Sequence, residues 1–286
     1  MTDLGLLYHF LGTGVVQTDK HIFLLQKKYA LKVIEKFGLK DCKLCKEDGS
    51  EAVNESEYRQ IVGSLLYLTA AIPDIMFASS LLARFMHNST RKHMGTAKRV
   101  LRYIQGTLDF GIEFIKGKTA TLIGYCDSDC VGSEVDRRST TSGYAFTLGS
   151  GRFSWASIKQ NTVALYTADA EYVSAAEATS QAKWLRFVLE DFGEEQVEGT
   201  PILCDNTSAI AMAKNSVFHQ KTRYISGKFH FIREAIQAKE IELIYCKTED
   251  QIADILTKAL SKDRFVYLRN LLGVKSAKGL EGSVDV

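Results

Sequence analysis

The sequence predicts an α/β fold: a mixed sheet of three antiparallel and then parallel strands with flanking helices, which a small helical module precedes. From residue 119 the elements run three strands, helix, strand, two helices, strand, helix, an order typical of an antiparallel meander followed by strand–helix crossovers. Residues 55–105, by contrast, show only helical apolar spacings. The 286 residues suffice for one large domain or two ordinary ones, and 45% hydrophobic and 24% charged residues are typical of a soluble globular protein.

The second half supplies the sheet. Strands are predicted at 121–127, 142–148 and 152–159, with a tight Gly-Ser-Gly turn at 149–151 between the last two. The remaining predicted elements are a long helix at 167–191, a strand at 201–205, a short helix capped by Asn206, a helix at 228–238, a strand at 241–247, and a helix from a capping box at 248–251 to about Leu260.

The first half begins with strands and a hairpin at 4–25 and a helix at 26–37. A polar stretch at 40–54 reads as an exposed linker, and helices at 55–68, 74–86 and 91–105 lead to a strand at 111–115. We therefore expect segments at 1–48, 49–118 and 119–274, and a flexible tail at 275–286.

Charge is unevenly distributed along the chain. Residues 1–119 carry 17 Lys and Arg against 12 Asp and Glu, a net charge of +5, whereas residues 120–286 carry 19 against 22, a net charge of −3. This asymmetry suits a polyanion that one part holds and another cuts. Lysines on solvated helix faces would give the same counts.

The cysteines and the termini favour an intracellular protein. Cys42 and Cys45 form a lone CxxC without a nearby His, so we expect unpaired thiols. Cys126 and Cys204 precede two acids in predicted strands and should face the opposite side, in packing roles. No apolar run approaches the ~20 residues that span a bilayer, and the N-terminus lacks signal-peptide features, so we expect no membrane partner and no secretion.

Four acids stand out by their positions. Asp127 and Asp205 each end a predicted strand, Glu171 lies near the start of the long helix, and Asp254 lies on a helix between Ala253 and Ile255. Each alone could be structural, as a turn residue or as a complement to a helix dipole. Together they could converge on two divalent ions, and carboxylate oxygens suit Mg²⁺ or Mn²⁺ in an in-line phosphoryl displacement.

Several motifs carry a family resemblance. They are Asp136-Arg137-Arg138-Ser139-Thr140, Ser142-Gly143-Tyr144, residues 154–160, Ala170-Glu171-Tyr172, Cys204-Asp205-Asn206, residues 230–234, and residues 253–258. These resemble the ribonuclease H domain of Ty1/copia retrotransposon Pol polyproteins. Residues 6–12 are similar to the end of the reverse-transcriptase palm, and residues 62–68 and 97–103 to the thumb or connection helices.

The resemblance implies a ribonuclease H-like fold and cleavage of the RNA strand of RNA–DNA hybrids, with Asp127, Glu171, Asp205 and Asp254 as both the metal-binding and the catalytic acids for two Mg²⁺ or Mn²⁺ ions. It implies a cytoplasmic (in a virus-like particle) or nuclear location and, as a partner, the rest of a Pol polyprotein. The expected nucleic-acid contacts are Arg137, Arg138, Ser139, Thr140, Lys159, Gln160, Lys98, Arg99 and Arg102.

The chain also departs from the family pattern. No Tyr-x-Asp-Asp occurs, so we expect no reverse-transcriptase activity, and Met1 resembles an internal polyprotein residue. Thr140-Thr141 holds one residue more than the usual run, and residues 222–226 lack the usual His and acid. Two alternatives follow: a catalytically dead, domesticated or relic fragment that at most binds nucleic acid, and an integrase-like enzyme, against which the order of the acids and the missing zinc-binding region argue.

Overall fold

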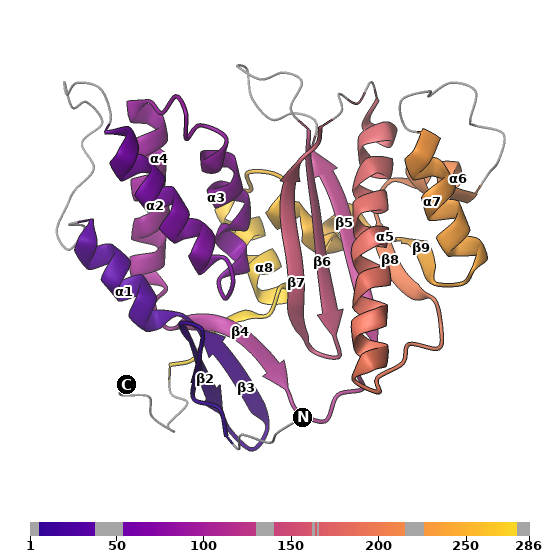
Figure 1. Ribbon diagram of the computed structural model, residues 1–286, viewed down its shortest axis with the longest axis horizontal. Coiled ribbons are helices and arrows are strands. Elements are labelled where there is room, and N and C mark those ends of the chain that lie inside the picture. Colours follow the sequence, from indigo (N-terminus) through magenta and orange to yellow (C-terminus); the bar gives the residue numbers. More distant parts are fainter. Residues whose placement is uncertain are drawn as a thin grey trace. The chain divides into compact units, whose positions relative to one another are not determined.

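The computed structural model describes residues 6–37, 54–129, 140–161, 164, 166–214 and 226–278. The chain divides into two compact units, one of Met1–Gly117 with Leu272–Val286 and one of Lys118–Leu271. Most of the expected linker lies outside the described residues. Figure 1 labels most of the helices and strands of both units.

Unit 1 contains the predicted helical module. Its helices are α1 (Lys27–Lys36), α2 (Glu55–Leu68), α3 (Met76–Ala83), which follows the 3₁₀ turn η1 (Pro73–Ile75), and α4 (Arg91–Gly106). The Asn54 side chain caps α2 by accepting from the Ser56 and Glu57 N–H groups. Apolar residues at helical spacing, such as Ile61, Leu65 and Leu101, bury one face of each helix in a shared core.

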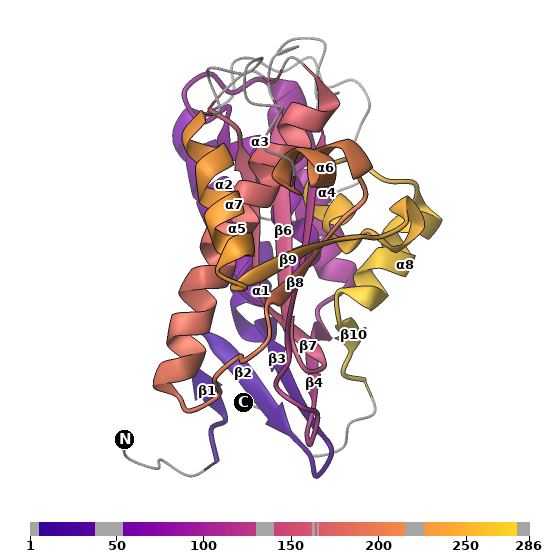
Figure 2. The same cartoon turned by 90° about the vertical axis from the view of Figure 1, so that its right-hand side faces the viewer.

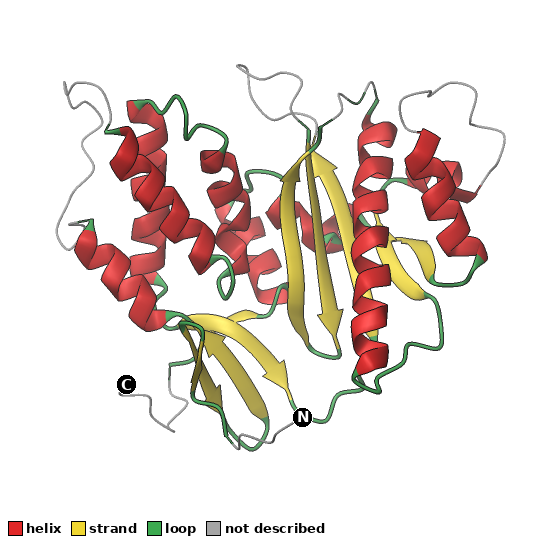
Figure 3. Cartoon of the chain, viewed as in Figure 1, coloured by secondary structure: helices red, strands yellow, loops and turns green. Residues whose placement is uncertain are grey.

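Unit 1 also holds an antiparallel sheet in the order β1-β2-β3-β4-β10. Strands are drawn in yellow in Figure 3. Its strands are β1 (His9–Phe10), β2 (Thr13–Gln17), β3 (His21–Leu25), β4 (Phe110–Ile115) and β10 (Val274–Ser276). The last strand corrects the expected tail, because Lys275 and Ser276 pair with β4 and Lys275 forms an ion pair with Glu113. A strand of three residues carries too little pattern for β10 to be predicted from the sequence.

Unit 2 contains the predicted mixed sheet, in the order β7-β6-β5-β8-β9. Strands β5 (Leu122–Asp129), β6 (Thr141–Leu148) and β7 (Gly151–Lys159) are antiparallel neighbours. Strands β8 (Thr200–Cys204) and β9 (Ile241–Tyr245) continue the sheet in parallel from β5. The ribonuclease H-like sheet predicted from the sequence is therefore confirmed.

Helices flank this sheet. They are α5 (Thr167–Asp191), α6 (Thr207–Lys214), α7 (Ser226–Gln237) and α8 (Lys262–Leu271). Figure 2 shows α5 and α7 on one side of the sheet and α8 on the other. Helix α5 packs on β5, β6 and β8 through small buried residues such as Ala175 and Ala178, which let helix and sheet approach closely.

The predicted helix from Thr248 to about Leu260 is wrong. Two 3₁₀ segments replace it, η4 (Thr248–Asp250) and η5 (Ile252–Leu256). The expected capping box does not form, because the Thr248 hydroxyl donates to Asp205 Oδ2 (2.9 Å). Instead the Gln251 side chain caps η5 by accepting from the Ala253 N–H (3.2 Å). Segment η5 packs on β5, β6 and α8.

Candidate active site

Asp127 lies on β5, and Asp205 directly follows β8, the parallel neighbour of β5. The pairing of β5 with β8 sets Tyr125 opposite Leu203, so the same register carried two residues further brings Asp127 beside Asp205. Asp127 is buried and Asp205 half-buried. Strand β5 continues to Asp129 through its pairing with β6, so the prediction that it ends at Asp127 is wrong. Asp127 lies instead just beyond the parallel pairing with β8.

The first turn of α5 is fixed to the sheet near Glu171. The Ser174 hydroxyl donates to the Asp127 main-chain oxygen (2.6 Å), and Gln160 Nε2 donates to the Ala170 main-chain oxygen (2.9 Å). Ser174 and Gln160 are themselves buried. Glu171 is therefore presented to the end of the sheet from a rigid element rather than from a loop.

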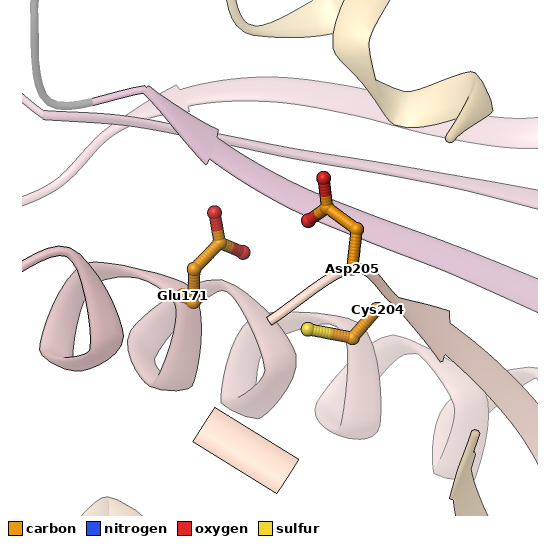
Figure 4. A group of neighbouring side chains, drawn as sticks. All are labelled: Glu171, Cys204 and Asp205. Carbon is orange, nitrogen blue, oxygen red and sulfur yellow. The ribbon is translucent and has the colours of Figure 1, made fainter. Parts of the chain in front are cut away.

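Glu171 is buried and only partly satisfied. Its Oε1 accepts from the Ser128 N–H (3.2 Å), whereas its Oε2 has no hydrogen-bond partner among the described residues. Figure 4 shows the carboxyl groups of Glu171 and Asp205 turned toward one another. The sulfur of Cys204 lies close to both carboxyl groups. One oxygen of Glu171, one oxygen of Asp205 and this sulfur all lie within 4.8 Å of one another.

Asp254 reaches the site from η5, which Gln251 anchors. Gln251 is fully buried, and its Nε2 donates to the main-chain oxygens of Cys126 (2.9 Å) and Leu203 (3.4 Å). These oxygens belong to β5 and β8, and Cys126 directly precedes Asp127. A single side chain thus ties the segment that carries Asp254 to the strands that carry Asp127 and Asp205.

A second contact joins η5 to the sheet at Asp127. The Thr257 hydroxyl donates to Asp127 Oδ2. Gly143 pairs with Asp127 across β6, and a Cβ there would lie 2.7 Å from Thr257 Cγ2 and 2.9 Å from Leu256 Cβ. The absence of a side chain at position 143 therefore lets η5 approach the strand.

The structure brings the four predicted acids together in two overlapping groups. Asp127, Asp205 and Asp254 form one group whose carboxylate oxygens lie within 4.8 Å of one another, and Glu171 joins Asp205 and Cys204 in the other. Asp205 belongs to both. Hard carboxylate oxygens and the orphaned Glu171 Oε2 fit a divalent cation, which could satisfy several acids at once. These groups of side chains could therefore hold metal ions.

Two basic side chains border the first group. Lys258 Nζ lies 2.9 Å from Asp254 Oδ1 and 3.4 Å from Asp127 Oδ2, and an Arg264 guanidinium nitrogen lies 3.4 Å from Asp254 Oδ2. Burial acts to lower the pKa of Lys258, but the charges of Asp127 and Asp254 outweigh it and raise that pKa. Both cations partly offset the crowded negative charge.

Burial and crowding raise the pKa of two acids. Burial, reinforced by the negative charges of Asp254 and Asp205, raises the pKa of Asp127 to about 6, although Lys258 and the Thr257 hydroxyl oppose the change. Burial, followed by the charge of Asp127, raises the pKa of Glu171 to about 10. Without a cation, Glu171 therefore retains its proton at neutral pH.

Some of the residues expected to contact nucleic acid are buried, and others are exposed or lie outside the described residues. Gln160 and Thr140 are buried, and Gln160 Nε2 is committed to Ser142 Oγ (2.8 Å) and the start of α5, so the structure contradicts a surface role for both. Lys159 is exposed on β7. Arg137, Arg138 and Ser139 lie outside the described residues, as does most of the 222–226 loop, and Lys98, Arg99 and Arg102 belong to α4 of unit 1.

Sequence reasoning missed several residues of this site. Lys258 follows Asp254 by four residues, and that spacing was the available signal for an ion pair. Gln251 gave no such signal, since its partners are main-chain oxygens 48 and 125 residues away. Cys204 was assigned to packing, and it does lie in the core, but Glu171 approaches from α5 on the side that Cys204 faces.

Known transposon proteins are similar to nearly the whole chain. The Retrovirus-related Pol polyprotein from transposon RE1 of Arabidopsis thaliana is 35% identical over 279 residues, which cover 94% of this chain and 19% of that protein. The corresponding polyprotein from transposon TNT 1-94 of Nicotiana tabacum is 34% identical over 300 residues, with coverages of 96% and 22%. The chain thus spans about a fifth of the length of these relatives.

A shorter relative is the uncharacterized mitochondrial protein AtMg00810 of Arabidopsis thaliana, 34% identical over 194 residues, with 64% of this chain and 80% of that protein covered.

Among solved structures, the chain is similar to the foamy viral protease-reverse transcriptase in complex with an RNA/DNA hybrid (TM-score 0.49, 12% identity, 88% of this chain and 30% of that one). It is also similar to LC11-RNase H1 in complex with an RNA/DNA hybrid (TM-score 0.36, 15% identity, 48% and 93%). No family model matches the sequence. On the identity that extends over nearly its whole length, the chain belongs to the family of retrovirus-related Pol polyproteins of copia-type transposons.

Proposed function

We propose that unit 2 is a ribonuclease H, which hydrolyses the RNA strand of RNA–DNA hybrids with the help of divalent ions. The observation that carries this proposal is the position of Asp205, which belongs to both groups of potential metal ligands. Overlapping groups of carboxylates from separate rigid elements are the ligand set that two neighbouring ions require. The resemblance of the four acids to the metal-binding acids of the family supports the same assignment.

The proposed cofactor is a pair of Mg²⁺ or Mn²⁺ ions. Asp127, Asp205 and Asp254 would hold one ion, and Glu171 with Asp205 would contribute to the second. When bound, the ions would lower the pKa of the attacking water and stabilise the leaving oxygen of an in-line displacement at phosphorus.

The protein's own groups prepare the ligands. Thr257 and Thr248 donate hydroxyl hydrogen bonds to Oδ2 of Asp127 and of Asp205 and so fix the orientation of both carboxylates without neutralising their charge. Glu171 has to release its proton before it can act as a ligand, because its raised pKa keeps it protonated at neutral pH. Its burial keeps bulk water from competing for the same oxygens.

The proposed substrate would be recognised by the shape of the hybrid and by its 2′-hydroxyl groups. Distinguishing RNA from DNA requires contacts to the 2′-hydroxyl across the shallow minor groove. Exposed Lys159 remains a candidate for a backbone contact in unit 2, and the basic residues of α4 remain candidates in unit 1. No helix in the described part of the chain is long and apolar enough to cross a membrane, and an intracellular location remains a prediction.

Unit 1 is proposed to be the palm end and the connection helices of the parent polyprotein. The boundary between Gly117 and Lys118 lies next to the domain boundary expected from the sequence. No Tyr-x-Asp-Asp occurs in the sequence, so we expect hydrolysis without DNA synthesis. The rest of a Pol polyprotein is the proposed protein partner.

The proposal is tested by offering the purified chain an RNA–DNA hybrid, double-stranded RNA, double-stranded DNA and single-stranded RNA, each with Mg²⁺ or Mn²⁺. We expect cleavage of only the RNA strand of the hybrid, leaving 3′-hydroxyl and 5′-phosphate ends, and no cleavage by Asp254→Asn. Binding of the hybrid without cleavage by a folded protein would favour the relic reading. Equal cleavage of single-stranded RNA would contradict the proposed specificity.

A further inference from the structure

Lys258 contacts two of the acids at once. Its ammonium nitrogen is 2.9 Å from Asp254 Oδ1 and 3.4 Å from Asp127 Oδ2. Both acids are buried, and the Lys258 side chain itself is only 30% exposed. It comes directly after Thr257, whose hydroxyl also donates to Asp127 Oδ2. The same short segment thus contributes an acid, a hydrogen-bond donor and a cation to the site.

The position of this ammonium conflicts with that of a divalent ion. The two acids that it bridges belong, with Asp205, to a group whose carboxylate oxygens lie within 4.8 Å of one another. A divalent ion between Asp127 and Asp254 would compete for the oxygens that Lys258 contacts and would repel its charge at short range. The two cations therefore exclude one another.

We infer that Lys258 is the counter-ion of the metal-free site and that a divalent ion has to displace it from Asp127 and Asp254. This inference rests on the proposed metal site. The Lys258 ammonium can be displaced easily for two reasons. Among the described residues it forms ion pairs only with Asp127 and Asp254, and it is carried by a flexible stem of four carbon atoms. Lys258 then lowers the affinity of this position for metal while it stabilises the empty site.

Arg264 does not serve the same purpose. Its guanidinium donates to the main-chain oxygens of Glu249 and Thr248, which hold it beside η4. It touches Asp254 only through Oδ2 (3.4 Å) and has no ion pair with Asp127 in the described structure. Arg264 can therefore stay in place when a metal ion binds, whereas Lys258 cannot.

Mn²⁺ binding, measured by electron paramagnetic resonance of the free ion, tests the inference without reference to activity. We expect Lys258→Met to bind Mn²⁺ at least about fivefold more tightly than the parent chain, since a competing cation has been removed. Lys183→Met is the matched control. Lys183 is 28% exposed and pairs with Glu240 (2.6 Å). It lies about three turns of α5 beyond Glu171, so its loss should leave Mn²⁺ affinity unchanged.

Thermal unfolding gives a second readout. Without metal, Lys258→Met should unfold at a lower temperature than the parent, because Asp127 and Asp254 then lack their counter-ion, and Mn²⁺ should restore more of the lost stability than it adds to the parent. Lys258→Arg, which retains the charge, should stay closer to the parent in both measurements.

The possible results distinguish a failure of this inference from a failure of the proposed function. Unchanged or weaker Mn²⁺ binding in Lys258→Met would overturn the inference, even if the parent chain cleaves hybrids. Mn²⁺ binding by Lys258→Met alone would support it. Absence of Mn²⁺ binding in both proteins would overturn the inference together with the metal site on which the proposed function depends.

Discussion

Thr257 donates its hydroxyl to Oδ2 of Asp127, a residue 130 positions earlier in the chain. This contact joins the last acidic segment of the site to its first acidic strand. Gly143, opposite Asp127 on β6, leaves room for the Thr257 methyl group beside this contact. The geometry of the four acids therefore depends on residues that carry no charge.

The Thr257 hydroxyl is expected to contribute to both stability and metal binding. Thr257→Val keeps the shape of the side chain but removes the donor and leaves a buried carboxylate oxygen with one partner fewer. A buried hydrogen bond to a charged group contributes roughly 1.5–3 kcal/mol, so a loss of that order in the free energy of unfolding is expected from chemical denaturation. Thr257→Ser retains the hydroxyl and should lose less. A Thr257→Val protein as stable as the parent would show that the hydroxyl contributes nothing.

Gly143 is expected to tolerate no side chain. Its Cβ would meet Thr257 Cγ2 at 2.7 Å and Leu256 Cβ at 2.9 Å, so Gly143→Ala should push η5 away from β6. Overpacking of this kind typically costs about 1–3 kcal/mol. Gly63→Ala is the control, because a Cβ at this exposed position of α2 meets nothing within 4 Å and alanine favours a helix. A Gly143→Ala protein as stable and as active as the parent would refute the close approach.

Gln251 is expected to position Asp254 without touching a metal ion. Gln251→Met keeps roughly the size of the side chain and adds no charge, but removes the donor to the main-chain oxygens of Cys126 and Leu203. We expect weaker Mn²⁺ binding and a loss of roughly 2 kcal/mol in unfolding free energy, because a buried acceptor loses its partner. Wild-type Mn²⁺ affinity in a folded Gln251→Met protein would show that η5 is held by its apolar contacts alone.

The stabilisation that metal provides is expected to grow with pH. The pKa of Asp127 is raised to about 6 and that of Glu171 to about 10, so the folded protein disfavours their ionised forms. Without metal, the free energy of unfolding should therefore fall as pH rises above the ordinary carboxyl range, through pH 6 for Asp127 and on toward pH 10 for Glu171.

A divalent ion relieves this cost by neutralising the ionised carboxylates. The rise in Tm on adding Mg²⁺, relative to the same protein in EDTA, should be larger at pH 8 than at pH 5. Asp127→Asn removes one of the titrating groups and should reduce the difference between the two pH values. An equal or larger rise at pH 5 would contradict the raised pKa values.

Much of the sheet could be predicted from the sequence, because its signals are local. The alternation and turn residues of β5, β6 and β7 predict an antiparallel meander, and the runs that become β8 and β9 end in polar residues as parallel strands do. The helix expected after Thr248 failed for a tertiary reason, since Thr248 bonds Asp205 and Gln251 bonds two strands instead of capping a helix.

The acids of the candidate site could be predicted from the sequence, but the uncharged residues that position them could not. Asp127, Glu171, Asp205 and Asp254 were recognisable by residue type and by position in their elements. Gln251, Gly143 and Thr257 belong to motifs that the sequence shows, but their contacts exist only in the folded chain, so no local pattern reveals which acids they support. Gln160 shows the converse error, because a polar residue beside a basic one looks like a surface contact when it is in fact buried.

The central claim is that four acids hold two divalent ions for hydrolysis of RNA in hybrids, and Asp205 tests it most directly because it alone joins both groups. The measurement is single-turnover cleavage of a labelled RNA–DNA hybrid with Mg²⁺ or Mn²⁺ by the parent chain and by Asp205→Asn, each shown to be folded. The account predicts metal-dependent cutting of the RNA strand by the parent and a loss of at least about a hundredfold in Asp205→Asn, since this variant weakens both groups. Equal rates in the two proteins, or no cutting by a folded parent chain, would contradict it.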